Sequence, residues 1–91
     1  MTLTIAQHLR MATMTRAMQV ARGLVKEELK RQRVRIADVE AREITARAKD
    51  YLIAHPALVA DARPVVESWI ARGVFGKRAQ RAFANLSVTG L

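Results

Sequence analysis

The sequence predicts an all-α protein, a small bundle of about four helices, and three observations support this prediction. Apolar residues recur at spacings of three and four along most of the chain, and they nowhere alternate as they do in strands. Proline occurs at only 2 positions and glycine at 4, so the helical pattern is interrupted at few points. Neither an internal repeat nor a low-complexity segment is visible.

The chain has 91 residues, which suits a single helical domain over residues 1–91 with one core. We expect its ends to fray at about residues 1–4 and 87–91. The absence of cysteine excludes disulfides, a thiolate nucleophile and a cysteine-based zinc site. The longest uncharged run, residues 1–9, is too short for a membrane span.

The longest helix is predicted over about residues 5–33, and it is amphipathic. Its apolar stripe consists of Met11, Met14, Met18, Ala21, Val25 and Leu29. At about 1.5 Å per residue it spans about 44 Å, which is long for so small a domain. We therefore expect part of the stripe to pack against a second copy in a homodimer, through Met11, Met14, Met18 and Val25.

The second helix is predicted to begin at Asp38, which is a good N-cap, and to end at His55 because Pro56 follows. Glu43 and Arg47 form an i,i+4 pair on its solvated face. Its apolar face consists of Ala41, Ile44, Ala48, Leu52 and His55, with Tyr51 alongside.

The third helix is predicted to continue across Pro64, where it is kinked because proline cannot donate to the carbonyl of Ala60. Leu58, Ala62, Val65 and Trp69 keep the helical period on both sides of Pro64, and Gly73 ends the helix. A short basic helix at about 77–85 completes the bundle. Its apolar face is Ala79, Ala82, Phe83 and Leu86, and its other face is Lys77, Arg78 and Arg81.

The formal net charge of +8 is unevenly distributed along the chain. Residues 1–37 have eight basic and two acidic side chains, residues 38–73 five and six, and residues 74–91 three and none. A charge needed only for solubility has no reason to gather at both ends, so this distribution indicates an anionic partner. Lys77 and Arg78 also lie in a first helical turn, where the helix dipole disfavours cations.

No arrangement of residues in the sequence indicates catalysis. His8 and His55 have no third ligand or nucleophile at a helical spacing. Gly73 and Gly76 are separated by two residues, whereas a phosphate-binding P-loop has four between its glycines. We therefore expect no enzyme, no metal ion and no cofactor.

We interpret the chain as a nucleic-acid-binding protein of the cytoplasm, associated with the nucleoid if the nucleic acid is DNA. Duplex DNA is favoured because Tyr51, Trp69 and Phe83 fall on core faces and are not exposed for stacking. No recognition helix is evident, so contacts to phosphates would give weak sequence selectivity. The expected binding residues are Arg22, Lys26, Lys30, Arg33 and Arg35 in one group and Lys77, Arg78 and Arg81 in another.

An alternative interpretation is a protein-interaction module, such as an inhibitor, an adaptor or an assembly subunit. Such a module would bind an acidic protein through the basic or methionine-rich surface of the first helix. Attachment to a membrane surface is less favoured, because the apolar face of that helix contains neither tryptophan nor phenylalanine.

Overall fold

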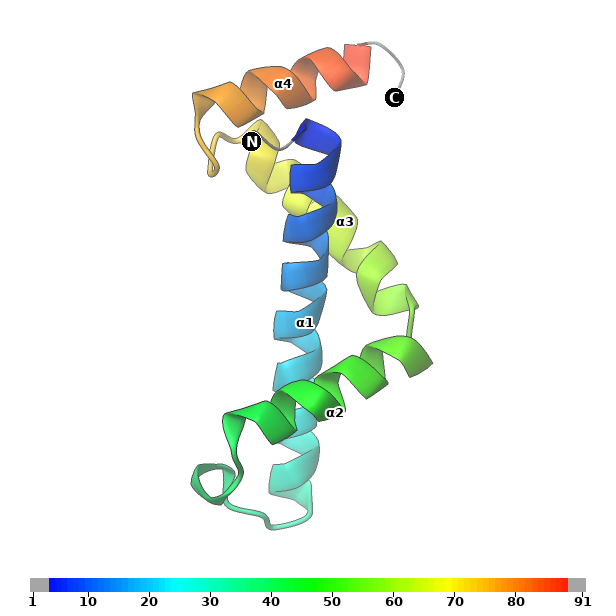
Figure 1. The fold of residues 1–91 in the computed structure, drawn as a ribbon, viewed down its shortest axis with the longest axis vertical. Coiled ribbons are helices and arrows are strands. Elements are labelled where there is room, and N and C mark those ends of the chain that lie inside the picture. Colours follow the sequence, from blue (N-terminus) through cyan, green and yellow to red (C-terminus); the bar gives the residue numbers. More distant parts are fainter. Residues whose placement is uncertain (1–3, 89–91) are drawn as a thin grey trace.

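The computed structural model describes residues 4–88, with side chains described as far as residue 85. Within 4–88 there are helices and turns but no strand, so the predicted all-α fold class is confirmed. The elements are α1 (Ile5–Arg31), the 3-10 turn η1 (Ile36–Asp38), α2 (Ala41–Ala54), α3 (Ala57–Ala71) and α4 (Lys77–Val88). The long helix α1 forms the axis of the molecule, with α2 crossing it near one end and α4 lying across the other (Figure 1).

Helix α1 begins with a capping box. The Thr4 side chain accepts a hydrogen bond from the Gln7 backbone N–H at 3.1 Å, and the Gln7 side chain accepts one from the Thr4 N–H at 3.0 Å. These two bonds satisfy N–H groups that a helix start otherwise leaves unpaired. Thr4, which the sequence assigned to the frayed start, is thus part of a defined helix cap, while residues 1–3 lie outside the described residues.

The buried side of α1 differs from the predicted stripe in its first half. Every fourth residue is buried, in the series Leu9, Thr13, Ala17, Ala21, Val25 and Leu29. At about 100° per residue, a spacing of four rotates this row by about 40° per step, so its two ends face nearly opposite sides. Met11 and Met14 are 57% and 45% exposed, so the straight stripe through them was wrong.

This rotation fits the neighbours of α1. The N-terminal part of the row, at Leu9, packs with α3 and α4, whereas Val25 and Leu29 pack with α2. A straight stripe serves one partner helix, but α1 has different partners at its two ends (Figure 1).

The connection from α1 to α2 also differs from the prediction. α1 ends at Arg31 rather than at Arg33, which takes a left-handed conformation with φ of 62°. Asp38 is part of η1, and Glu40 is the N-cap residue of α2. Ile36 and Val39 pack against the core, which draws this segment into a tight turn and delays the start of α2.

Helix α2 follows the predicted pattern in its middle, but Ala41 and His55, which were assigned to its apolar face, lie at its two ends and are exposed. α2 buries Ile44, Ala48 and Leu52, and it ends before His55 and Pro56 as expected. His55 is exposed and stacks on Tyr51, with ring centroids 4.1 Å apart.

α3 continues as one helix through Pro64, whose ring is exposed and therefore faces away from the core. It buries Ala62, Val66 and Ile70. Among the described residues, no helix is long and apolar enough to cross a membrane.

The turn from α3 to α4 contains the predicted helix stop. Gly73 has φ of 81°, and the N–H groups of Gly73 and Val74 donate to the carbonyls of Ile70 and Trp69 at 3.0 Å each. This is the Schellman arrangement that a glycine after a helix favours. The Gln80 side chain then donates to the carbonyl of Ala71 at 2.6 Å, which ties the start of α4 to the end of α3.

The last helix, α4, extends three residues beyond its predicted end. Ala79 and Phe83 pack against the cluster of Leu9, Val66 and Ile70, which confirms part of the predicted apolar face. Leu86, the last member of that face, lies outside the described side chains.

The molecule is elongated and its core is thin. Its extents are 49 × 24 × 22 Å, and its radius of gyration of 16.0 Å exceeds the value of about 12 Å for a compact chain of this length. Four of the buried apolar residues are alanines: Ala17, Ala21, Ala48 and Ala62. Small side chains let the helices approach closely but contribute little buried area, so much of the surface of α1 remains accessible.

Candidate nucleic-acid interface

The two predicted groups of basic residues lie at opposite ends of the longest axis. The first group is at the C-terminal end of α1 and in the turn that follows, and the second is on α4 (Figure 1). All eight side chains are exposed. The structure therefore presents two separate basic surfaces, near the ends of a molecule 49 Å long, instead of one continuous surface.

The basic group at the end of α1 lies among acidic residues. Residues 22–47 contain eight basic and five acidic side chains. Three of the predicted binding residues have polar partners: Lys30 with Glu27 at 3.6 Å, Arg35 with Asp38 at 3.9 Å and Arg22 with Thr45 at 3.0 Å. Such exposed pairs add little stability, but the neighbouring carboxylates weaken the positive field at this end.

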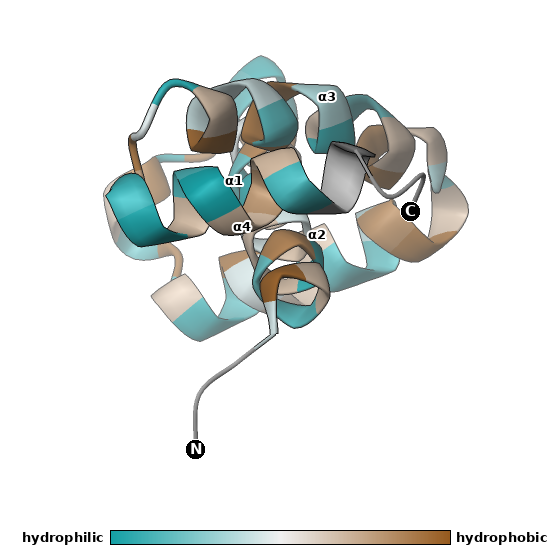
Figure 2. Ribbon diagram, turned by 90° about the horizontal axis from the view of Figure 1, so that it is seen from above, coloured by the Kyte–Doolittle hydropathy of each residue, from teal (hydrophilic) through white to brown (hydrophobic). Residues whose placement is uncertain are grey.

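The basic group on α4 has no acidic neighbour in sequence. Residues 68–85 contain four basic side chains and no acidic one: Arg72, Lys77, Arg78 and Arg81. None of the four forms an ion pair within the described part of the chain, and all are exposed. We call these four residues the α4 basic surface. Figure 2 looks down on this end of the molecule and shows hydrophilic residues at the start of α4.

Local structure holds the α4 basic surface in place. At about 100° per residue, Lys77, Arg78 and Arg81 fall within about 100° on one side of α4. The opposite side packs on the core through Ala79 and Phe83, so the three cations are directed outward. Arg72 follows the last residue of α3, and the Gln80 hydrogen bond to Ala71 ties that end of α3 to the start of α4. The helix dipole adds a partial positive charge at this N-terminus.

The four residues predicted for self-association do not share one surface. Met11 and Met14 are exposed, and Met18 is partly buried against the core. Val25 is only 8% exposed and packs within the chain's own core, next to α2. The prediction joined them because it assumed a straight apolar stripe, and the rotation of the buried row separates them.

A groove that the sequence did not predict lies beside the first half of α1. It encloses about 1030 Å³ between α1, the end of α2 and the start of α3. Leu9, Met14, Leu52 and Val59 contribute apolar lining, and Ile53, which is 80% exposed, also lines it. The charged side chains that line it are Arg10 and Arg63, and Arg63 pairs with Glu67 at 3.1 Å.

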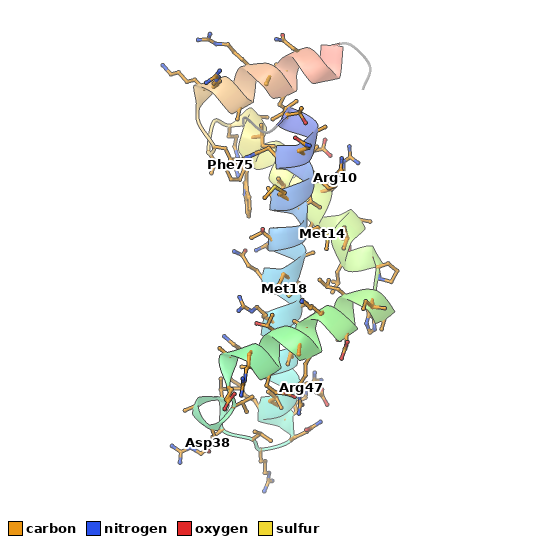
Figure 3. All side chains as sticks on the ribbon, viewed as in Figure 1. Arg10, Met14, Met18, Asp38, Arg47 and Phe75 are labelled. Atoms are coloured by element: carbon orange, nitrogen blue, oxygen red, sulfur yellow. The ribbon has the colours of Figure 1, made fainter. Side chains whose placement is uncertain are left out.

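A smaller pocket of about 330 Å³ is lined by α1, Trp69 of α3 and the turn before α4. Its lining includes His8, Thr15, Arg16, Gln19, Trp69 and Phe75. The His8 and Phe75 rings meet edge to face with centroids 5.2 Å apart, and the Arg16 guanidinium lies 5.5 Å from the centre of the Trp69 ring. Figure 3 shows Phe75 on one side of α1 and Arg10, which lines the larger groove, on the other.

Sequence reasoning missed this pocket for identifiable reasons. Trp69 was assigned to the core, and it is in fact partly buried, with one part of its ring at the pocket. Phe75, which lies between Gly73 and Gly76, was not among the predicted site residues. An aromatic residue between two glycines and close to three cations was the signal that could have found it.

No group of three or more potential metal ligands is present among the described residues. No protein-family model, curated protein or solved structure matches this chain. Fold and surface together define a small all-α protein with exposed cations at one end that have no acidic neighbour in sequence.

Proposed function

We propose that this protein binds nucleic acid, mainly through phosphate contacts made by the α4 basic surface. The observation that carries the proposal is the set of four exposed cations, three on α4 and Arg72 in the turn before it, with no acidic residue between residues 68 and 85. Phosphate oxygens are the natural partners of such a surface, and their contacts release condensed counterions. The opposite end is a weaker candidate because its cations are interspersed with carboxylates.

The proposed contacts determine how selective the binding is. Side chains that meet phosphates fix the position of a protein on the nucleic acid but do not distinguish bases. Among the side chains of α4 that the structure describes, the exposed polar ones are the three cations and Asn85, so we propose weak sequence selectivity. With this function we propose a cytoplasmic location, alongside the nucleic acid.

Neutralising the α4 basic surface tests the proposal against the effect of net charge alone. The variant K77Q/R78Q/R81Q removes three charges from α4, and K26Q/K30Q/R33Q removes three from the other end. If four phosphates are contacted, log Kd for a random duplex should change with log salt with a slope of about 3.6 in magnitude. The α4 variant should lower this slope to about 0.9, because one cation, Arg72, remains.

The control variant should keep most of the wild-type slope, as measured by fluorescence anisotropy at several salt concentrations. An equal reduction of this slope in both variants would show that binding depends only on the total charge of the protein. A binding constant independent of salt would overturn the proposed function.

A second candidate function, a protein-interaction module, is favoured by the groove beside α1. We propose that its occupant is a second copy of this chain. The groove and the protruding Ile53 lie on the same surface, as a two-fold interface requires, so each copy can insert Ile53 into the groove of the other. The chain exposes 6854 Å² of surface, about 1,500 Å² more than a compact protein of this mass. A standard interface covers about 800 Å² on each partner, so this excess is large enough for one such interface.

Light scattering over a range of concentrations tests this second proposal. The wild-type protein should show the mass of a dimer, and I53D should shift it to a monomer because a charge would enter an apolar groove. V74D is the matched control, since Val74 is also exposed, at 62%, and does not line the groove. A wild-type protein that stays monomeric at all concentrations would contradict self-association and leave the groove to a different, acidic partner.

A further inference from the structure

The smaller pocket adjoins the α4 basic surface through one short segment. The turn between α3 and α4 contains Arg72, which belongs to that surface, and Phe75, which lines the pocket, and Lys77 of the same surface begins α4 directly after it. The Schellman turn at Gly73 and the Gln80 hydrogen bond to Ala71 fix this turn. One fixed turn therefore carries both a wall of the aromatic pocket and the first cations of the basic surface.

The chemistry of the pocket suits a flat, polar, aromatic group. Phe75 is 39% exposed, and Arg16 presents a planar guanidinium, a group on which bases stack as they do on aromatic rings. Thr15 and Gln19 add hydrogen-bonding groups beside these planar faces.

One polar atom of a residue that lines the pocket has no hydrogen-bond partner. Among the described residues, His8 Nε2 is buried and makes no hydrogen bond. Buried polar atoms are nearly always hydrogen-bonded in folded proteins. His8 Nε2 is an exception to this rule, and it is covered from solvent in the structure.

We infer that the smaller pocket receives one unpaired base of a single-stranded nucleic acid whose phosphates lie on the α4 basic surface. The inference rests on the proposed nucleic-acid function and specifies its ligand. Stacking of bases on aromatic side chains beside a positively charged track is the general mode of single-strand binding. A duplex offers the same phosphates to the α4 basic surface. Its bases stay paired and stacked, so it cannot place a base in the pocket.

A base pocket favours single-stranded nucleic acid over the duplex DNA that the sequence favoured. That preference rested on the absence of exposed aromatic residues, judged from Tyr51, Trp69 and Phe83. The structure adds Phe75, which is partly exposed, and makes Trp69 part of a pocket wall.

The single tryptophan makes the pocket directly observable. Trp69 lines the pocket and is the only tryptophan in the chain, so its fluorescence reports on the occupant. The probes are a ten-nucleotide strand of thymidylate and an abasic strand with the same number of phosphates. We expect the thymidylate strand to quench Trp69 and to bind about ten-fold more tightly than the abasic strand. A duplex of equal length should bind like the abasic strand.

Substitutions at the pocket separate stacking from charge. F75A should remove the ten-fold advantage of the thymidylate strand and leave binding of the abasic strand unchanged. F75L keeps an apolar contact for His8 and should have the same effect, which guards against a loss of folding in F75A. R16K keeps the charge but removes the planar group, so it should also reduce the advantage. V74A, in the same turn but outside the pocket lining, should retain it.

The outcomes distinguish this inference from the proposed function. Equal binding of the thymidylate and abasic strands, with unchanged Trp69 fluorescence, would overturn the base pocket while leaving phosphate binding intact. Failure of both strands and of the duplex to bind would overturn the nucleic-acid function itself.

Discussion

Arg33 holds a backbone conformation that glycine normally holds. Its φ of 62° is the only positive value at a non-glycine residue in the part of the chain that the structure describes. The N–H groups of Arg33 and Val34 donate to the carbonyls of Lys30 and Leu29 at 2.9 Å, so the end of α1 is a Schellman turn with arginine in the glycine position. A side chain in the left-handed region costs about 1 kcal/mol or more.

Replacing Arg33 by glycine should therefore stabilise the protein. We expect R33G to raise the free energy of unfolding by about 0.5–1 kcal/mol, which corresponds to roughly 4 °C in melting temperature. Gln32 is the matched control, because its φ of −81° is allowed for any residue and Q32G should lower stability by a similar amount. Thermal unfolding, followed by circular dichroism, gives the melting temperatures of R33G and Q32G. A lower melting temperature for R33G would mean that the arginine side chain contributes more than the strain costs.

Two glycines should respond in opposite directions to alanine. Gly73 has φ of 81°, a conformation that a side chain strains, so G73A should lower stability by about 1 kcal/mol or more. Gly23 lies inside α1 with open space around an added Cβ, so G23A should raise stability by about 1 kcal/mol. Urea unfolding of the two variants provides the comparison, and changes of the same sign would contradict the assigned backbone conformations.

At the scale of the elements, alanines set how closely α1 and α2 pack. Ala21 and Ala48 are both completely buried in the cluster that joins these helices. A larger side chain has no room there without displacing a helix. We expect A21L to destabilise the protein by about 1–3 kcal/mol, whereas A46L, on the exposed side of α2, should have little effect. Denaturant unfolding measures the difference. Equal midpoints for both variants would show that α1 and α2 can move apart far enough to accommodate a leucine at position 21.

The sequence was sufficient to predict the local features of each element. The stop before Pro56, the continuation through Pro64 and the glycine stop at Gly73 all depend on residues within a few positions of each other. The face of α1 depends on more distant contacts, because its buried row rotates to meet α3 and α4 at one end and α2 at the other. Asp38 was misassigned as an N-cap because contacts of Ile36 and Val39 with the core decide where that turn lies.

At the scale of the whole molecule, the position of charges matters more than their sum. The sequence identified Lys77, Arg78 and Arg81, and the structure adds Arg72 and separates this surface from the basic residues near Lys30 by most of the length of the molecule. Neither the groove nor the pocket was predictable, because each is bounded by helices whose crossing angles the pattern of apolar residues does not specify. Phe75 became significant only when its turn was placed against α1.

The central claim is that nucleic acid binds at the α4 end of the protein and not at the other end. The most direct test is a titration of isotopically labelled protein with the ten-nucleotide thymidylate strand, followed by two-dimensional NMR of the backbone amides. We predict shifts at Arg72, Phe75, Lys77 and Arg81, with little change around Lys26, Lys30 and Arg35. Shifts concentrated around Lys26, Lys30 and Arg35, or spread evenly over the surface, would contradict the claim.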